Sequence, residues 1–214
     1  VRESDMRGDW LIPIAALCLA GCHGGTQQSG VGASVPALSA GTHDLVLGGD
    51  SGASQGTAFI GDSGGGYIVL GSDSNAPASV VYKRGSAAQG WQRVPAAATA
   101  PQLQTRLDEV LPAAALPVLA GQYHTLIGDR LVSFTLDGAG VITSSGNDCM
   151  LSGQVQTGQP LASALRVSGQ ISACGGADGQ YQGVLFADPD ASNAAFRLVV
   201  DDGSAVRDFY VFSG

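Results

Sequence analysis

Apolar and polar residues alternate along much of the second half of the chain. Apolar side chains occupy every second position in residues 132–137, 165–173 and 196–200. A period of two is typical of β-strands that bury one face and expose the other. Asp202-Gly203 is a strong signal for a hairpin turn into a further strand at 205–212.

Additional strands are predicted near 121–127, 150–156 and 181–187. The pattern therefore predicts seven or eight antiparallel strands within residues 119–214. Because one face of these strands is apolar and the other polar, we predict a small β-barrel or a folded-over, barrel-like sheet.

The first half of the chain shows shorter apolar segments separated by turns rich in glycine, serine and aspartate. Asp50, Asp62 and Asp73 lie in three of these turns, 12 and 11 residues apart. This spacing indicates an antiparallel meander. We predict a four- or five-stranded unit at 41–95, with strands at 45–47, 58–60, 67–70, 80–83 and 91–94.

Residues 96–118 are rich in alanine and proline and are predicted to link the two β units. Within them, Leu103, Leu107, Val110 and Leu111 have the spacing of one helix face. Pro101 and Pro112 flank this pattern, at positions that suit the first turn and the end of a helix. The predicted fold class is therefore all-β, with an antiparallel meander joined by one short helix to a barrel-like domain.

The N-terminal region contains an apolar run from Trp10 to Leu19, which is shorter than the ~20 residues of a membrane-spanning helix. The run ends in Leu19-Ala20-Gly21-Cys22, which resembles the lipobox of bacterial lipoprotein signal peptides. The resemblance implies that residues 1–21 are a signal peptide, whose translation starts at either Val1 or Met6. It also implies that Cys22 carries acyl chains, which would attach the protein to a membrane.

In that family the residue after the cysteine influences sorting, and His23 favours an outer-membrane lipoprotein that faces the periplasm. Residues 22–40 then form the lipidated cysteine and a flexible tether, because they are small, polar and non-periodic. Of the 10 basic and 18 acidic residues in the whole chain, 8 and 15 remain after residue 21. This acidic balance argues against a nucleic-acid partner.

The chain contains four cysteines, of which Cys18 and Cys22 belong to the predicted signal peptide and its lipobox. The remaining pair, Cys149 and Cys174, is predicted to form a disulfide in an oxidising periplasm. A metal pair or a redox centre has less support, since the sequence has no C-x-x-C motif and no histidine after His124.

One motif resembles a catalytic one. Residues 61–65, Gly-Asp-Ser-Gly-Gly, are similar to the sequence around the nucleophile of trypsin-like proteases and of GDS-type esterases. A nucleophilic Ser63 would need a histidine base, yet His43 is only 20 residues upstream and the predicted segment after Ser63 is a strand. Because Gly-Asp-Ser-Gly recurs at 49–52, we interpret the motif as a turn.

Residues 188–193 begin like a calcium loop but lack its glycine and its final acid, so we interpret them as a hairpin loop. No metal or cofactor is expected.

The sequence predicts a non-catalytic binding or structural module of the cell envelope, whose partner is another envelope protein or a small apolar ligand in the barrel mouth. The alternatives are an inhibitor or immunity lipoprotein that blocks a cell-wall hydrolase and, third, a serine hydrolase that uses Ser63. Candidate residues for a ligand or partner surface are Trp91, Tyr123, His124, Tyr181 and Tyr210.

Overall fold

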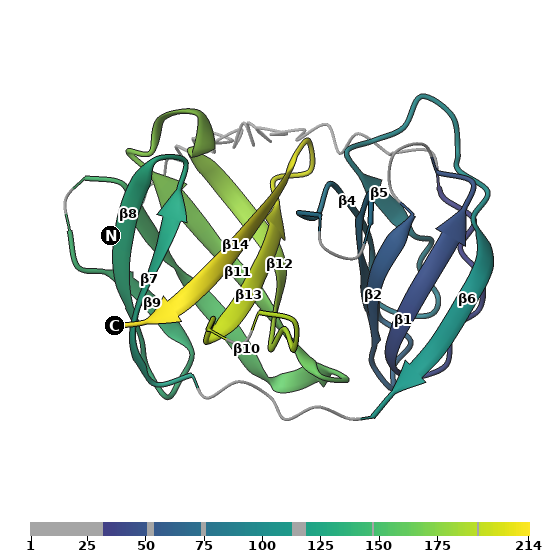
Figure 1. Ribbon diagram of the computed structural model, residues 1–214, viewed down its shortest axis with the longest axis horizontal. Coiled ribbons are helices and arrows are strands. Elements are labelled where there is room, and N and C mark those ends of the chain that lie inside the picture. Colours follow the sequence, from purple (N-terminus) through teal and green to yellow (C-terminus); the bar gives the residue numbers. More distant parts are fainter. Residues whose placement is uncertain (1–31, 51–53, 74–75, 113–118, 147, 192) are drawn as a thin grey trace, which may run out of the picture.

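The computed structural model describes residues 32–50, 54–73, 76–112, 119–146, 148–191 and 193–214. Two β units lie side by side, a six-stranded antiparallel sheet and a closed eight-stranded barrel (Figure 1). The predicted all-β class is confirmed. The only helical segment in the described residues is a 3-10 turn at Gly175–Ala177.

The barrel has a simple up-and-down topology. Each strand pairs with the next one along the chain, and the last strand pairs with the first to close the sheet. The sequence predicts seven or eight strands in this domain, and the described residues form eight. They are β7 (Gly121–Ile127), β8 (Arg130–Leu136), β9 (Val141–Ser144), β10 (Met150–Leu161), β11 (Ala164–Ser172), β12 (Gly179–Phe186), β13 (Phe196–Asp201) and β14 (Val206–Ser213).

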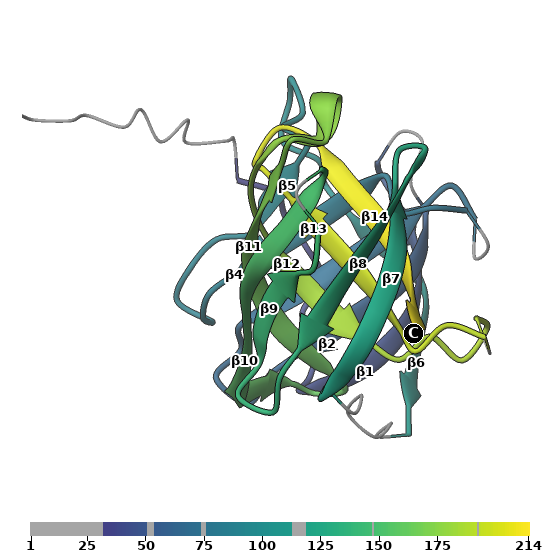
Figure 2. The same ribbon diagram turned by 90° about the vertical axis from the view of Figure 1, so that its left-hand side faces the viewer.

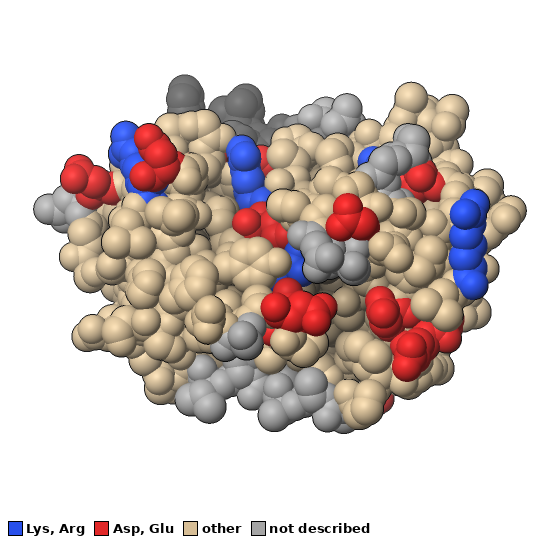
Figure 3. Space-filling model, in the orientation of Figure 1, with Lys and Arg blue, Asp and Glu red and all other residues tan. Residues whose placement is uncertain are grey.

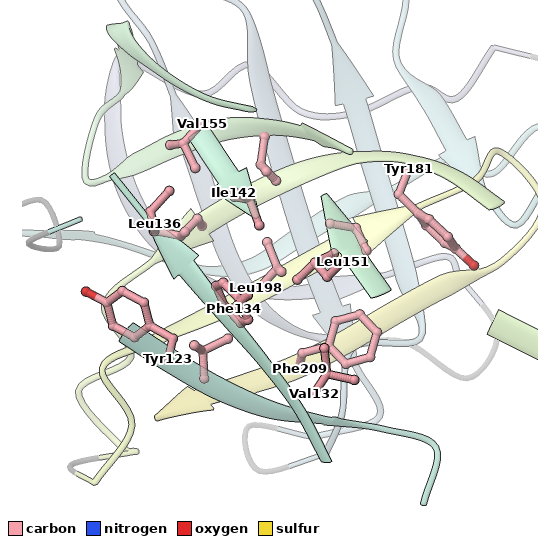
Figure 4. Close-up of a cluster of buried hydrophobic side chains, with 14 of the residues drawn as sticks. Tyr123, Val132, Phe134, Leu136, Ile142, Leu151, Val155, Tyr181, Leu198 and Phe209 are labelled. Atoms are coloured by element: carbon pink, nitrogen blue, oxygen red, sulfur yellow. The ribbon is translucent and has the colours of Figure 1, made fainter. Parts of the chain in front are cut away.

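The barrel interior is filled by the apolar half of each alternating strand (Figure 4). Tyr123 and Tyr181 lie at opposite ends of this core, with their hydroxyl groups pointing away from it. A void among Ile142, Leu198 and Phe209 measures about 20 Å³, which is room for about one water molecule. The interior at that point is therefore a packed core.

A disulfide joins Cys149, just before β10, to Cys174, just after β11. The two strands are antiparallel and Met150 pairs with Ser172, so both cysteines lie just beyond this last pair, with Cα atoms 4.4 Å apart. The predicted disulfide is confirmed. Its sequence separation of 25 residues corresponds to a stabilisation of about 3–4 kcal/mol if it acts by limiting the entropy of the unfolded chain.

The first sheet has the strand order β5-β4-β3-β2-β1-β6. Backbone hydrogen bonds link Ala33 to Trp91 and Ser34 to both Pro101 and Leu103, so residues 33–34 connect the two ends of the sheet. Ala33 and Ser34, which belong to the predicted tether at 22–40, are thus bonded to the first sheet. The strands are β1 (Gly41–Gly48), β2 (Gln55–Ile60), β3 (Gly66–Gly71), β4 (Val80–Arg84), β5 (Gln92–Val94) and β6 (Gln104–Leu111).

The prediction of a short helix at 101–111 is wrong, because residues 104–111 form strand β6 and pair with β1. The apolar positions that suggested a helix face are not buried together: Leu107 is 48% and Val110 is 60% exposed. Pairing with β1 satisfies backbone groups along an edge that would otherwise lack a partner, which outweighs the local helical pattern.

The two units pack through a shared apolar layer. Phe59 and Val69 of the first sheet meet Val184 and Phe186 of the barrel wall, and the rings of Phe59 and Phe186 lie 4.7 Å apart. The layer includes residues of β2, β3 and β4 on one side and of β10 to β13 on the other. Since these barrel side chains point away from the interior, the first sheet covers one part of the outer wall.

Polar contacts border this apolar layer. Lys83 Nζ donates to Asp201 Oδ1 at 2.5 Å, and both side chains are buried. Thr42 Oγ1 donates to Ser163 Oγ at 3.0 Å, at the tip of the β10–β11 hairpin. The Ala78 amide donates to Asp208 Oδ2 at 2.6 Å. These pairs fix the register of the two units against each other.

Candidate functional site

The barrel wall farthest from the first sheet is the candidate site. The apolar layer against the first sheet involves β10 to β13, and β8 lies four strands from β12 in either direction around the closed barrel. Figure 2 looks at this wall, formed by β7, β8 and β9. No described part of the chain is seen to lie across these strands in that view.

Five outward-facing residues, which we call the wall patch, lie on this wall: the apolar Leu126, Leu131 and Phe212 and the polar His124 and Ser133. Leu126 pairs with Leu131 across β7 and β8, while His124 lies opposite both Ser133 and Phe212. The His124 ring stacks on Phe212 with centroids 5.8 Å apart. Leu126 is 60%, Leu131 67% and Phe212 37% exposed.

A surface depression of about 260 Å³ overlaps the wall patch at His124, Leu131 and Ser133. The rest of its lining consists of the buried Tyr123 and Phe134 together with Gln122, Thr135, Ser145 and Gly214. In Figure 3, no lysine, arginine, aspartate or glutamate appears over the C-terminal end of β14 and the adjacent part of β7. Contiguous exposed apolar groups rimmed by polar residues are typical of interaction surfaces.

Of the five aromatic and histidine residues proposed from sequence, only His124 belongs to the wall patch. Tyr123 lies beneath it, with its ring edge-on to Phe196 at 4.9 Å. Tyr181 is buried at the other end of the barrel, where its hydroxyl donates to the Ala177 carbonyl at 2.8 Å. Both tyrosines are core residues.

The other two candidates lie elsewhere. Trp91 is buried in the first sheet, beneath the guanidinium of Arg84 at 4.4 Å. Tyr210 faces outward and packs against the guanidinium of Arg197 at 5.3 Å, and burial raises the pKa of its hydroxyl. The structure does not bring the five residues together in one site.

Sequence reasoning missed Leu126, Leu131 and Phe212. Each sits beside an inward-facing apolar residue, in the pairs Leu126-Ile127, Leu131-Val132 and Val211-Phe212. An apolar residue at a position where the alternation requires a polar one was the available signal, because such a residue faces outward in a strand.

The Gly61–Gly65 segment forms the turn between β2 and β3. The Gly61 amide donates to the Gly65 carbonyl at 2.9 Å, and Gly64 has a φ of +71°, which favours glycine. His43 is buried elsewhere, with Nδ1 2.6 Å from Asp108 Oδ1 and Nε2 3.0 Å from the Ser39 carbonyl. Both ring nitrogens of His43 are thus engaged within the first sheet.

Asp188 belongs to the loop between β12 and β13, as the sequence predicts. Its Oδ1 accepts from the Asp190 amide at 3.0 Å, and its Oδ2 accepts from Arg197 Nη1 at 3.0 Å. These contacts occupy both carboxylate oxygens. Among the described residues, no group of three or more His, Cys, Asp or Glu side chains is arranged to hold a metal ion.

Cys22 lies outside the described residues. Within the described ranges, no helix is long and apolar enough to span a membrane. The described residues form an eight-stranded β-barrel packed against an antiparallel sheet, and one barrel wall that no described part of the chain covers exposes Leu126, Leu131 and Phe212. Comparisons with protein-family models, curated proteins and solved structures found no match to this chain.

Proposed function

We propose that this chain is an outer-membrane-anchored, periplasm-facing lipoprotein that binds another envelope protein through the wall patch, without catalysis. The observation that carries the binding role is the exposure of Leu126, Leu131 and Phe212 on the wall opposite the first sheet. Covering these side chains would remove apolar surface from water, which favours association by about 25 cal/mol for each Å² buried.

A protein partner fits the geometry better than a small apolar ligand. The core residues fill the barrel interior, and the void described among them measures about 20 Å³. The surface depression of about 260 Å³ is shallow and lies below the usual range of ligand pockets, about 300–1,000 Å³. A depression of this size can accommodate an apolar side chain of a partner protein.

The membrane anchor rests on the lipobox-like sequence that ends at Cys22. Replacing Cys22 by serine is expected to abolish labelling by a radioactive fatty acid and to prevent lipoprotein maturation, because serine offers no thiol for acylation. Labelling in growing cells followed by immunoprecipitation measures this. The control is Cys18→Ser, which should keep the label, since Cys18 lies in the predicted signal peptide. Persistent labelling of the Cys22→Ser protein contradicts the proposal.

The binding role is tested by a photo-crosslinking amino acid at Ser133, within the wall patch, in cells that produce the anchored protein. We expect one dominant cross-linked protein. The double change Leu126→Ser and Leu131→Ser should reduce its yield about tenfold or more, because two apolar contacts are lost. Both leucines are exposed, so stability should change little.

The matched control is Leu107→Ser with Val110→Ser, two exposed apolar residues on β6 of the first sheet. This pair should leave the cross-linked yield unchanged. If both double variants reduce capture equally, or if Ser133 captures no partner, the wall patch is not the binding surface.

A second function, an inhibitor or immunity lipoprotein, is favoured by one feature of the first sheet. Asp44 and Glu109 lie directly opposite each other on β1 and β6, and both are exposed. Like charges at opposed positions destabilise a sheet, and a basic partner would offset their repulsion. This function is favoured if the double variant Asp44→Asn with Glu109→Gln no longer cross-links the partner protein while the double leucine variant still does.

A further inference from the structure

A second surface feature lies where the first sheet meets the barrel. It is a polar cavity of about 380 Å³, which we call the seam pocket. Its lining combines three cationic side chains, Lys83, Arg84 and Arg166, with the amides of Gln89, Gln92 and Gln182. Both units contribute, since Arg166 and Gln182 belong to β11 and β12 and the other residues to the first sheet or its loops.

The positive charge of the seam pocket is only partly balanced. Lys83 is paired with Asp201, but neither Arg84 nor Arg166 has a carboxylate within 4.0 Å in the described part of the chain. Elsewhere in the same protein, Arg93 and Arg197 are each paired with aspartates. Of the 8 basic residues after residue 21, three line this one cavity. In an acidic protein this concentration is unexpected from composition alone.

Arg84 also carries a buried polar atom without a partner. Its Nε atom is removed from solvent and has no hydrogen bond in the structure. Leaving a buried donor unsatisfied costs about 1–3 kcal/mol, and more for a charged group. Buried donors are normally satisfied, so Arg84 Nε is an exception, which it shares with Arg207 Nε outside the seam pocket. An oxyanion in the pocket would be bound by the outer N–H groups of Arg84.

The two guanidinium groups are held in place by aromatic rings. Arg84 lies over Trp91 at 4.4 Å, and Arg166 lies over Tyr67 at 5.6 Å. Gly65 leaves room for Arg166, because a Cβ at that position would come within 2.8 Å of its Nη2. Stacking engages the faces of a guanidinium and leaves its N–H edges free to bind a planar or tetrahedral oxyanion.

We propose that the seam pocket binds an oxyanion, a phosphate or carboxylate group carried by a small polar molecule. Arg84 and Arg166 would donate charge-assisted hydrogen bonds to the oxyanion. The three glutamine amides would bind polar groups on the rest of the molecule. This site is separate from the wall patch, and the proposal does not depend on the function assigned to that patch.

Titration of the ¹⁵N-labelled protein with sodium pyrophosphate, and separately with sodium citrate, tests the proposal at constant ionic strength. Nε–Hε resonances of Arg84 and Arg166 should shift in a saturable manner with at least one of the two anions. If only pyrophosphate gives saturable shifts, the ligand carries a phosphate group. If only citrate does, the ligand carries a carboxylate group. Shifts that follow only ionic strength, or no saturable shift with either anion, would overturn the proposal.

The matched variants are Arg166→Gln and Arg106→Gln. Arg166→Gln should weaken anion binding about tenfold or more, because one charged donor is removed. Arg106 is exposed on β6, outside the seam pocket, and its replacement should leave the affinity unchanged. If Arg84→Gln loses the stacking on Trp91 and unfolds, Arg166→Gln still decides the outcome. Equal affinity of wild type and Arg166→Gln would contradict the assignment.

Discussion

Replacing Phe186 by alanine is expected to lower the free energy of unfolding by about 3–5 kcal/mol. The Phe186 side chain projects outward from β12, yet it is only 5% exposed because the first sheet covers it. Its ring contacts that of Phe59 at 4.7 Å. Truncation removes this contact and leaves a cavity in the layer that joins the two units. Urea unfolding followed by intrinsic fluorescence and circular dichroism measures the effect.

Phe212→Ala is the matched control for this prediction. Phe212 also projects outward from the barrel, but it is 37% exposed and belongs to the wall patch. Its truncation should lower the free energy of unfolding by about 1–2 kcal/mol, clearly less than that of Phe186, because Phe212 is only partly buried. If both alanine variants lose the same stability, burial between the two units is not the source of the Phe186 effect. A Phe186 variant as stable as the wild type would show that the layer contributes little.

The barrel was predictable from sequence because its strands bury one face only. In β8, Val132, Phe134 and Leu136 point inward and are each 2% exposed, which gives the alternation that the sequence shows. The disulfide was predictable because Cys149 and Cys174 flank two consecutive strands of one hairpin. Both features depend on local pattern and on pairing between neighbours in the chain.

Strand β6 was not predictable by the same reasoning. Its partner β1 lies about sixty residues earlier, and for example Asp44 pairs with Glu109. The residues of β6 are largely exposed, so no alternation of buried and exposed side chains marks them as a strand. The apolar residues of this segment have the spacing of a helix face, and the sequence therefore predicted a helix, although no such face is buried in the structure. The need of the β1 edge for a partner is a property of the assembled sheet.

The contact between the two units left a signal that the prediction did not use. Along β3, Tyr67 and Val69 face the barrel, while Ile68 and Leu70 face the interior of the first sheet. A continuous apolar run of this kind is typical of a strand buried on both faces. The run thus predicts that something covers the outer face of the sheet, but it does not identify the barrel as the cover. Likewise, the seam pocket exists only once both units are in place.

Replacing Lys83 by methionine is expected to lower the free energy of unfolding at neutral pH by about 3–5 kcal/mol. Lys83 is the single lysine of the chain, and its Nζ lies 2.5 Å from Asp201 Oδ1 across the contact between the units. Asp201 is 1% exposed, and its Oδ2 has no hydrogen-bond partner in the structure. Removing the ammonium group leaves this buried carboxylate without its counter-ion. Urea unfolding at pH 7 measures the loss.

The pH dependence of this variant identifies the cause. Burial raises the pKa of Asp201 above 3.8 in the folded protein, while Lys83 opposes the increase. Without Lys83, the pKa should rise further. A carboxyl group whose pKa is raised in the folded state stabilises the fold at pH values below 3.8, the ordinary pKa. This contribution is lost as the pH rises through the folded-state pKa. The deficit of Lys83→Met should therefore shrink as the pH is lowered from 7 towards 4, by up to about 1.4 kcal/mol per pH unit.

Adding Asp201→Asn to Lys83→Met provides the control, since asparagine keeps an acceptor for the Gly203 amide, which Asp201 Oδ1 binds at 2.9 Å. The double variant should regain much of the lost stability at pH 7 and should lose the added pH dependence, because no buried charge remains. If the single variant shows the same deficit at every pH, the lost interaction is packing by the lysine side chain rather than compensation of the Asp201 charge. Lys83 would then contribute to stability mainly by the packing of its side chain. The apolar layer would provide almost all of the stabilisation between the two units.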